Sequence, residues 1–235
     1  MRRLAVLADL HIGAPARGHA EGEDTEAAYA VFARVADEVL ALAPDAVLIA
    51  GDVFDRAVAT DRALAAFGGL VSALADSDTP IVAVSGNHDA ESPLPARLLA
   101  PPQLRWLSAD SAETVVLEDL GLAVHGQSVA ARDELRDLAS GYPEALAGLV
   151  NIGLLHTSLS GEWSRRVCAA TDLSTLRGHG YEAWALGHVH ERMQLSAEPL
   201  VFYPGQPTAS ASGVAVLEVT PDGHVALGES VASEH

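Results

Sequence analysis

The first ninety residues alternate between short apolar runs and longer amphipathic segments, and this alternation constrains the fold more than any other feature. Apolar runs at 3–8, 46–50 and 80–85 have the length of buried strands. Residues 24–43 repeat apolar side chains with a helical period, and a second helix is expected over 58–75. Strands that alternate with helices predict parallel pairing through right-handed crossovers. The chain should therefore contain an α/β sheet whose strands end along one edge.

The rest of the chain is expected to consist mainly of strands and turns. Residues 90–112 are rich in proline and should form a loop with one helical turn at 94–99. A polar helix is expected at 130–139 and a short helix at 172–179. The sequence shows no repeat and no break in composition, so we expect a single domain over residues 1–235, without a cap domain. The remaining predicted strands are 114–117, 121–126, 150–155, 182–186, a hairpin over 192–203, and 213–219 and 224–231 around a Pro-Asp-Gly turn.

The composition of the chain limits its possible cellular location and its possible substrates. The formal net charge is −18 at pH 7, which repels polyanions and argues against strong free-standing nucleic-acid binding. No apolar run approaches the ~20 residues of a membrane span, and the first run lacks the cleavage site of a signal peptide. We therefore expect a cytoplasmic protein that does not contact a membrane. Cys168 is the only cysteine, so an intrachain disulfide is excluded and a thiolate metal site is not expected.

Polar side chains that can bind metal follow five of the predicted strands. Directly after the third strand, residues 86–89 read Gly-Asn-His-Asp, and the glycine allows a sharp turn. Because ligands gather at the carboxyl ends of parallel strands, we expect these side chains to converge. Oxygen and nitrogen donors without sulfur suit Mn²⁺, Fe²⁺ or Zn²⁺, and seven of them fit two ions that share a carboxylate. The candidate ligands are Asp9, His11, Asp52, Asn87, His156, His188 and His190.

These residues fall into blocks that resemble those of the calcineurin-like metallophosphoesterases. The blocks are Asp9-x-His11, Gly51-Asp52-x-x-Asp55-Arg56, Gly86-Asn87-His88-Asp89, the strand-end His156, and Gly187-His188-x-His190. Within that superfamily the chain is most similar to the SbcD-type DNA-repair exonucleases. Segments 7–13, 124–128, 155–157, 187–191 and 203–205 carry this likeness, which covers about residues 3–220. The resemblance implies a four-layer α/β/β/α sandwich with two mixed sheets.

The resemblance also implies a role for each site residue. One metal ion would be held by Asp9, His11, Asp52 and His190, and the other by Asp52, Asn87, His156 and His188, with Asp52 bridging. His88 would protonate the leaving oxygen or stabilise its charge. Asp55 would orient the ring of His88, and Arg56 would bind the phosphate. Two divalent ions are implied, for which we expect Mn²⁺, with Fe²⁺ or Zn²⁺ as alternatives.

The expected activity is metal-dependent cleavage of phosphodiester bonds in DNA, as an exonuclease or endonuclease acting in repair. The resemblance implies an ATPase subunit as partner, and a homodimer is a further expectation. The alternative is a small-molecule phosphodiesterase or phosphomonoesterase on the same scaffold, which the acidic charge and the missing cap domain favour. A non-catalytic scaffold would be expected to have lost ligand positions or His88, and all of them are present.

Several polar residues outside these blocks have simpler interpretations. We expect Asp89 only to cap the segment that follows it, and His125 to pack or hydrogen-bond at the rim of the sheet. Arg165 and Arg166, beside Trp163, are expected in an ordinary exposed loop, with contact to a nucleic-acid strand as the alternative. The Tyr-Pro-Gly block at 203–205 is expected to be a tight turn.

Overall fold

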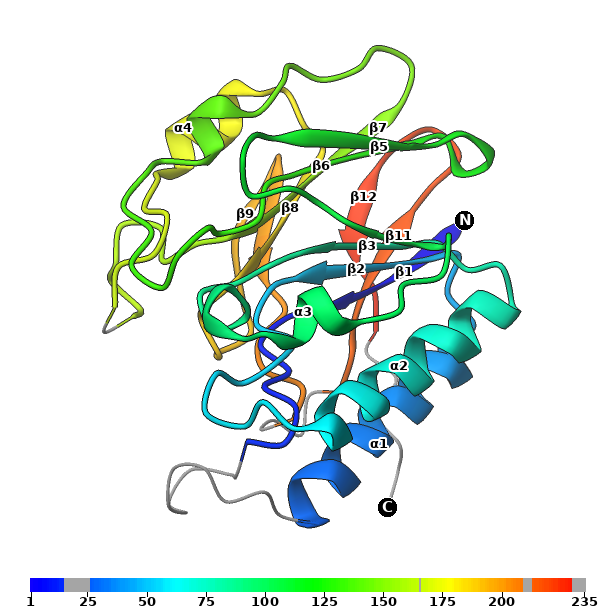
Figure 1. Cartoon of the computed structure of the whole chain (residues 1–235). Helices are drawn as coiled ribbons and strands as arrows, with labels where there is room; N and C mark the ends of the chain where they lie inside the picture. The colour runs from blue at the N-terminus through cyan, green and yellow to red at the C-terminus, as the bar shows by residue number, and fades with distance from the viewer. Residues whose placement is uncertain (15–25, 165, 209–212, 230–235) are drawn as a thin grey trace.

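The computed structural model describes residues 1–14, 26–164, 166–208 and 213–229, which form two six-stranded sheets packed face to face (Figure 1). The first sheet has the order β12-β11-β1-β2-β3-β4. Neighbours from β1 to β4 are parallel, whereas β11 is antiparallel to β1 and β12 to β11. Its strands are β1 (Arg2–Leu7), β2 (Ala46–Ala50), β3 (Ile81–Val84), β4 (Leu104–Trp106), β11 (Ala215–Val219) and β12 (Val225–Leu227).

The second sheet is also mixed and has the order β5-β6-β7-β8-β10-β9. The central strands β6, β7, β8 and β10 are parallel, and β5 and β9 close the two edges in antiparallel pairing. The expected hairpin over 192–203 is formed by β9 and β10. The strands are β5 (Glu113–Leu117), β6 (Leu122–Gly126), β7 (Val150–His156), β8 (Ala183–Gly187), β9 (Met193–Ala197) and β10 (Leu200–Tyr203).

Two long helices, α1 (Glu26–Leu42) and α2 (Asp61–Asp76), cover the outer face of the first sheet (Figure 1). Each turns one apolar stripe to the sheet, and in α1 this stripe includes Phe32, Val35 and Val39. The helix α2 begins after Thr60, whose hydroxyl accepts a hydrogen bond from the backbone N–H of Ala63 at 3.1 Å. The helical period of the sequence therefore corresponds to a single buried face on each helix.

The strands of the first sheet are apolar along both faces because both faces are buried. In β1, Ala5 and Leu7 face the helices, while Leu4 and Val6 face the second sheet. A sheet covered on both sides requires continuous apolar runs rather than alternation, as the sequence shows. The first sheet is thus sandwiched between the helices and the second sheet.

The outer face of the second sheet is covered by α4 (Leu173–Gly178), the short turn η3 (Ala139–Gly141) and the loops around them. Trp184 is the largest side chain in this layer and is fully buried. It occupies the space beside Gly153, where an added Cβ would lie 2.2 Å from its ring. The expected α/β/β/α layering is confirmed, although in the described residues the fourth layer contains more loop than helix.

Two predicted local structures were wrong. Residues 130–138 form turns and bends rather than a helix. The carboxylate of Glu134 accepts hydrogen bonds from the backbone N–H groups of Ala130 and Arg136. The backbone carbonyl of Glu134 accepts another from Ala169 N at 2.7 Å, which takes the place of a helical bond. The predicted loop over 90–112 contains, besides the expected helical turn α3 (Leu94–Arg97), the edge strand β4, which pairs with β3. The last strand is shorter than predicted: β12 ends at Leu227, and residues 230–231 of the prediction lie outside the described residues.

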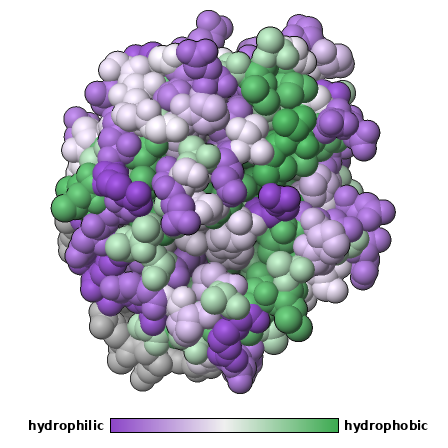
Figure 2. All heavy atoms as spheres, turned by 45° about the horizontal axis from the view of Figure 1, so that its top comes forward, coloured by the Kyte–Doolittle hydropathy of each residue, from purple (hydrophilic) through white to green (hydrophobic). Residues whose placement is uncertain are grey.

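The surface mixes hydrophilic and hydrophobic side chains, and on the face in Figure 2 the hydrophobic ones gather in patches. Large exposed apolar side chains include Leu99, Leu135, Trp163 and Val167. Within the described ranges, no helix combines the length and the apolar composition that crossing a membrane would need.

Candidate metal centre

The loops that follow β1, β2, β3, β7 and β8 bring all seven candidate ligands to one edge of the sandwich. The loop after β1 is tied to the loop after β2 by hydrogen bonds from Asp9 N to Gly51 O and from His11 N to Asp52 O, both 3.0 Å. Asp9, His11, Asp52, and Asn87 follow strands of the first sheet, whereas His156, His188 and His190 come from the second. The site therefore spans the junction between the two sheets.

Four of these side chains belong to residues with a positive φ angle. The values are 53° for Asp9, 42° for His11, 52° for Asp52 and 94° for His188. Residues other than glycine rarely adopt this region, and strained backbone of this kind clusters at functional sites. Glycine is required nearby, because a Cβ on Gly86 would lie 2.2 Å from Asp52 Oδ1. The backbone is thus held in an unfavourable conformation that directs these side chains toward one another.

The first group of ligands consists of Asp9, His11, Asp52 and His190. The Nε2 atoms of His11 and His190 lie 3.3 Å apart. His190 Nε2 is 3.8 Å from Asp9 Oδ1, and His11 Nε2 is 3.7 Å from Asp52 Oδ2. These are the four residues that the family resemblance assigns to one ion.

The second group consists of Asp52, Asn87, His156 and His188. His156 Nε2 lies 3.5 Å from Asp52 Oδ2 and 3.2 Å from Asn87 Oδ1. The Nδ1 atom of His188 lies 3.0 Å from the same amide oxygen. The two groups meet at Asp52 Oδ2, which is the place expected of a bridging carboxylate.

The separations between donor atoms fit metal coordination. Ligands bound at ~2.1 Å lie ~3.0 Å apart in octahedral and ~3.4 Å apart in tetrahedral geometry, close to the 3.0–3.8 Å found here. The ring protons are also placed suitably: His156 Nδ1 donates to Ala50 O at 2.9 Å, and His188 Nε2 to Arg166 O at 3.0 Å. Each bond leaves the other ring nitrogen with a free lone pair directed into the site.

Burial and charge favour the ionisation states that a metal requires. Burial lowers the pKa of His156 to about 4 and also lowers that of His188, so both rings are neutral at pH 7. Burial and the neighbouring Asp52 raise the pKa of Asp9 well above its ordinary value. Burial would also raise the pKa of Asp52, but attraction to His156 and His11 outweighs it and lowers that pKa. Two buried carboxylates this close ionise together only beside positive charge, which divalent cations supply.

A cavity of about 660 Å³ opens beside these ligands. Its lining includes Asp52, Asn87, His188 and His190, together with His88. The lining also includes Arg132, Trp163 and Arg166. The volume lies within the range of ~300–1,000 Å³ typical of ligand pockets. The ligands therefore face a space that can accept a substrate.

His88 and Asp55 lie together at the edge of the metal ligands. The backbone N–H of His88 donates to Asp52 Oδ1 at 2.8 Å, and its Nδ1 lies 3.1 Å from Asp55 Oδ2. The same carboxylate oxygen lies 3.4 Å from His11 Nδ1. Burial alone would raise the pKa of Asp55, but His11 and His88 hold it well below its usual range. The contact expected between Asp55 and His88 is present, and Asp55 also reaches His11.

A family model described as calcineurin-like phosphoesterase matches residues 2–192 of the chain. The chain belongs to this family. The family name implies hydrolysis of phosphoester bonds, and six of the seven candidate ligands, all except Asn87, lie in groups whose ligand atoms are within 4.8 Å of one another.

The chain is also similar to several named proteins. It is 30% identical over 223 residues to the DNA double-strand break repair protein Mre11 of Aeropyrum pernix (87% of this chain, 53% of the relative). It is 29% identical over 213 residues to the uncharacterized metallophosphoesterase YhaO of Bacillus subtilis (86% and 52%). The chain thus spans about half the length of these curated relatives.

Among solved structures, a dimetal phosphatase from Danio rerio is similar with a TM-score of 0.60 at 11% identity, covering 94% of this chain and 93% of that one. The protein TT1561 of Thermus thermophilus gives 0.57 at 13% identity, covering 97% and 98%. At these identities the likeness concerns the fold, and it agrees with a calcineurin-like phosphoesterase architecture.

Arg56, which the sequence predicts to bind the phosphate, lies beside Glu91. Its Nη1 atom is 3.7 Å from Glu91 Oε2, and Arg56 is not among the residues that line the cavity. Arg132 and Arg166 line it instead. The clamp role of Arg56 stays a prediction, and Arg165 lies outside the described residues.

Sequence reasoning missed two residues that support the centre of this calcineurin-like phosphoesterase. Asp89 does not cap the next segment with its side chain; it accepts hydrogen bonds from the backbone N–H groups of Val53, Phe54 and Gly86 at 2.9–3.1 Å. It thereby joins the loop that carries Asp52 to the loop that carries Asn87. The signal that could have found it is an acidic residue directly beside the predicted ligands, in a turn that follows a buried strand.

The second supporting residue is Arg192. Its Nε donates to Pro204 O at 2.9 Å and its Nη2 to Gly213 O. The turn at Gly205, with φ of 76°, then places Gln206 N 2.9 Å from His190 O. The Tyr-Pro-Gly block is therefore more than a turn, since it supports the backbone of His190.

Two other polar residues are accounted for without a role in metal binding. Burial raises the pKa of the Cys168 thiol, whose Sγ lies near the rings of His156 and His188 and 4.0 Å from His156 O, and the sequence does not predict it as a ligand. His125 is buried and contacts Thr114 Oγ1 at 2.8 Å and Asn151 Oδ1 at 3.0 Å, in agreement with the packing role expected for it.

Proposed function

We propose that the protein is a phosphodiesterase of nuclease type that cleaves DNA with two divalent cations, for which we propose Mn²⁺. The convergence of both ligand groups on Asp52 Oδ2, with His88 beside them at the cavity, is the observation that carries the chemistry. The nuclease assignment is supported by the relatives described as DNA double-strand break repair protein Mre11, from three species, at 28–30% identity.

The donor set fits two cations: Asp9, His11, Asp52 and His190 would hold one, and Asp52, Asn87, His156 and His188 would hold the other. When bound, such cations neutralise the non-bridging phosphate oxygens and lower the pKa of a water molecule. Neutralising the phosphate charge and lowering the pKa of the water are both needed, because the negative charge of a phosphodiester repels nucleophiles.

His88 is the residue that would act on the leaving group. Its backbone is fixed on Asp52 and its Nδ1 lies beside the Asp55 carboxylate, so Nδ1 carries a proton. Nε2 then remains for the substrate, and in the imidazolium form it donates a proton to the departing oxygen. Asp55 stabilises that imidazolium by its charge, because its own pKa lies well below the usual range.

The test is hydrolysis by the purified protein with Mn²⁺ after the bound metal has been removed and replaced. The substrates are a single-stranded DNA oligonucleotide, bis-p-nitrophenyl phosphate and p-nitrophenyl phosphate, with His88→Ala as the control for contaminating nucleases. We expect cleavage of the oligonucleotide and of the diester, both abolished by chelation. Hydrolysis of the monoester alone would refute the nuclease assignment.

A small-molecule phosphodiesterase or phosphomonoesterase is the second candidate. The net charge of −18 favours it, because a free DNA strand is repelled at long range. Two bound divalent cations would reduce that charge only to −14. Cleavage of bis-p-nitrophenyl phosphate without cleavage of the oligonucleotide is the outcome that this alternative predicts.

The oligomeric state, the partner and the cellular location of the enzyme are also proposals. We propose that the enzyme acts in the cytoplasm in DNA repair, with an ATPase subunit as partner and as a homodimer. Light scattering and co-purification from the source cell test the two assemblies.

A further inference from the structure

Part of the cavity lining, here called the wall, is formed by Arg132 and by the loop between β7 and α4. Trp163 lies in this loop, lines the cavity together with Asp52 and His88, and is 43% exposed. Of the two other tryptophans, Trp184 is fully buried, and Trp106 is partly buried and donates a hydrogen bond to Ser85 Oγ at 2.8 Å. Trp163 is therefore the tryptophan whose ring is available to a bound substrate.

The loop is held firmly against the metal centre. His188 Nε2 lies 2.8 Å from Ser164 Oγ and 3.0 Å from Arg166 O, on either side of the one residue that the structure does not describe there. The base of the loop is closed by a hydrogen bond from Ser158 N to Cys168 O at 2.9 Å. The neighbours of Trp163 are therefore positioned by the same imidazole that is a candidate ligand.

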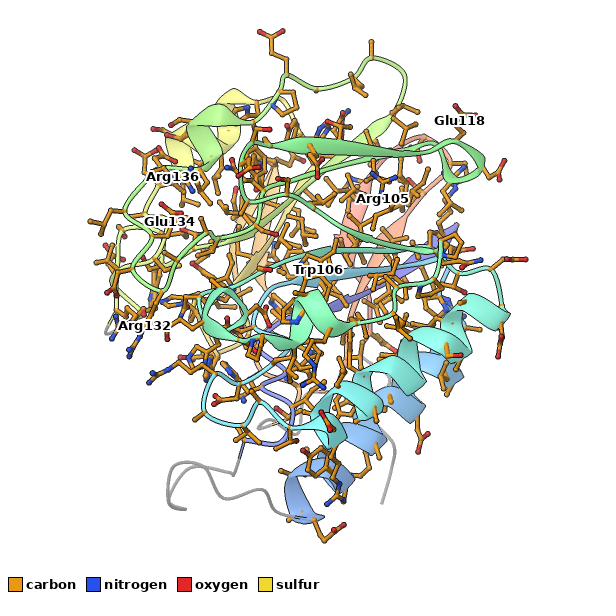
Figure 3. The ribbon with its side chains drawn as sticks, viewed as in Figure 1. Arg105, Trp106, Glu118, Arg132, Glu134 and Arg136 are labelled. Carbon is orange, nitrogen blue, oxygen red and sulfur yellow. The ribbon has the colours of Figure 1, made fainter. Side chains whose placement is uncertain are left out.

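Two arginines, Arg132 and Arg166, line the cavity. Arg132 lies at the edge of the molecule in Figure 3. Arg166 pairs with Asp133, and Arg132 Nε lies 3.9 Å from Glu91 Oε2. Ion pairs this exposed are weak, so a phosphate group can replace the carboxylates.

A second hollow of about 430 Å³ adjoins the first at Arg166. It is lined by Asp133, Arg166 and two strongly exposed apolar residues, Leu135 at 78% and Val167 at 51%. The wall thus presents an aromatic ring, then a guanidinium group, then an apolar surface. A base, a phosphate and a second base follow one another in the same way along a single strand.

We propose that this wall is the binding surface for unpaired nucleotides, a proposal that rests on the proposed nuclease function. Trp163 stacks on the base beside the scissile phosphate, and Arg166 binds the next phosphate. Leu135 and Val167 contact the base that follows. Inside a duplex the faces of the bases are covered by their neighbours, so such a surface selects single strands and frayed ends. Trp163 is then a specificity-determining residue that acts through substrate binding.

The experiment compares Trp163→Ala and Trp163→Phe with the unchanged protein, using a single-stranded oligonucleotide and bis-p-nitrophenyl phosphate as substrates. The matched control is Leu99→Ala, which removes another exposed apolar side chain that lines neither hollow. For Trp163→Ala we expect the KM for the oligonucleotide to rise about 10-fold or more, with kcat changed less. Trp163→Phe should recover most of this loss, and Leu99→Ala should leave KM and kcat for both substrates within about twofold of the unchanged protein.

A second measurement uses oligonucleotides that lack one base at successive positions. The unchanged protein should cleave poorly when the missing base is the one next to the cut, whereas Trp163→Ala should be insensitive to it. Equal KM values for the oligonucleotide in Trp163→Ala and the unchanged protein would overturn the assignment of Trp163 alone. Failure of the unchanged protein to cleave any oligonucleotide while it hydrolyses the small diester would instead overturn the nuclease function, and this surface assignment with it.

Discussion

Arg192→Met offers a sharp test of how the metal centre is supported. Methionine retains much of the length of the side chain but cannot donate, so the carbonyl groups of Pro204 and Gly213 each lose a hydrogen bond. A buried acceptor left without a donor costs about 1–3 kcal/mol. Because the arginine is only partly buried, we take the lower part of this range for each carbonyl and expect a loss of about 2–3 kcal/mol in unfolding free energy for both together.

At about 2–4 °C for each kcal/mol in a chain of this size, the loss corresponds to a fall in melting temperature of roughly 4–12 °C. The variant should also bind metal less well, because the turn that holds His190 O through Gln206 N depends on Arg192. Loss of such an outer contact typically weakens metal affinity about 10–100-fold.

The assay combines thermal unfolding of the metal-free protein with calorimetric titration of Mn²⁺. The control is Arg97→Met, an exposed arginine paired with Asp61, which should change the unfolding free energy by less than about 0.5 kcal/mol. If Arg192→Met melted like the unchanged protein and bound two Mn²⁺ ions with unchanged affinity, the supporting role of Arg192 would be refuted.

Three further predictions concern the site and its rim. His88→Ala should keep both metal ions but lose about 10²–10⁴-fold in turnover, as metal analysis and initial rates can show. Asp52→Ala should lower the metal content at both positions, since Asp52 Oδ2 lies at 3.5–3.7 Å from ligands of each group; elemental analysis after dialysis checks this. The pKa of Glu134 is lowered to about 2, chiefly by Arg136, so its stabilising contribution is present above the ordinary value near 4.5 and is lost as the pH falls toward 2. Glu134→Gln should flatten this part of the acid-unfolding curve, and an unchanged curve would contradict the assignment.

The sequence predicted which strand ends lie together at the candidate site, because its signals there are local. Asp52 and Asn87 each follow an apolar run that ends in glycine, and parallel strands bring such positions together whatever the loops do. The edge strand β4 was missed because three residues, Leu104 to Trp106, are too few to show a pattern.

Features that depend on the path of the loops were beyond sequence reasoning. The predicted helix over 130–139 gave way to contacts of Glu134 with a loop distant in sequence. Whether Arg56, Arg132 or Arg166 approaches the cavity is likewise decided by long-range packing. The same holds for Arg192, whose partners lie 12 and 21 residues further along the chain.

The division of the ligands between the two sheets has a mechanical consequence. Asp9, His11, Asp52 and Asn87 follow strands of one sheet, while the imidazoles of His156, His188 and His190 follow strands of the other. Any cation bound by ligands from both groups would therefore cross-link the two sheets, in addition to its role in catalysis. The melting temperature should rise with metal concentration, because ions that bind only the folded protein stabilise it. The ions that support catalysis would then also hold the two sheets in place.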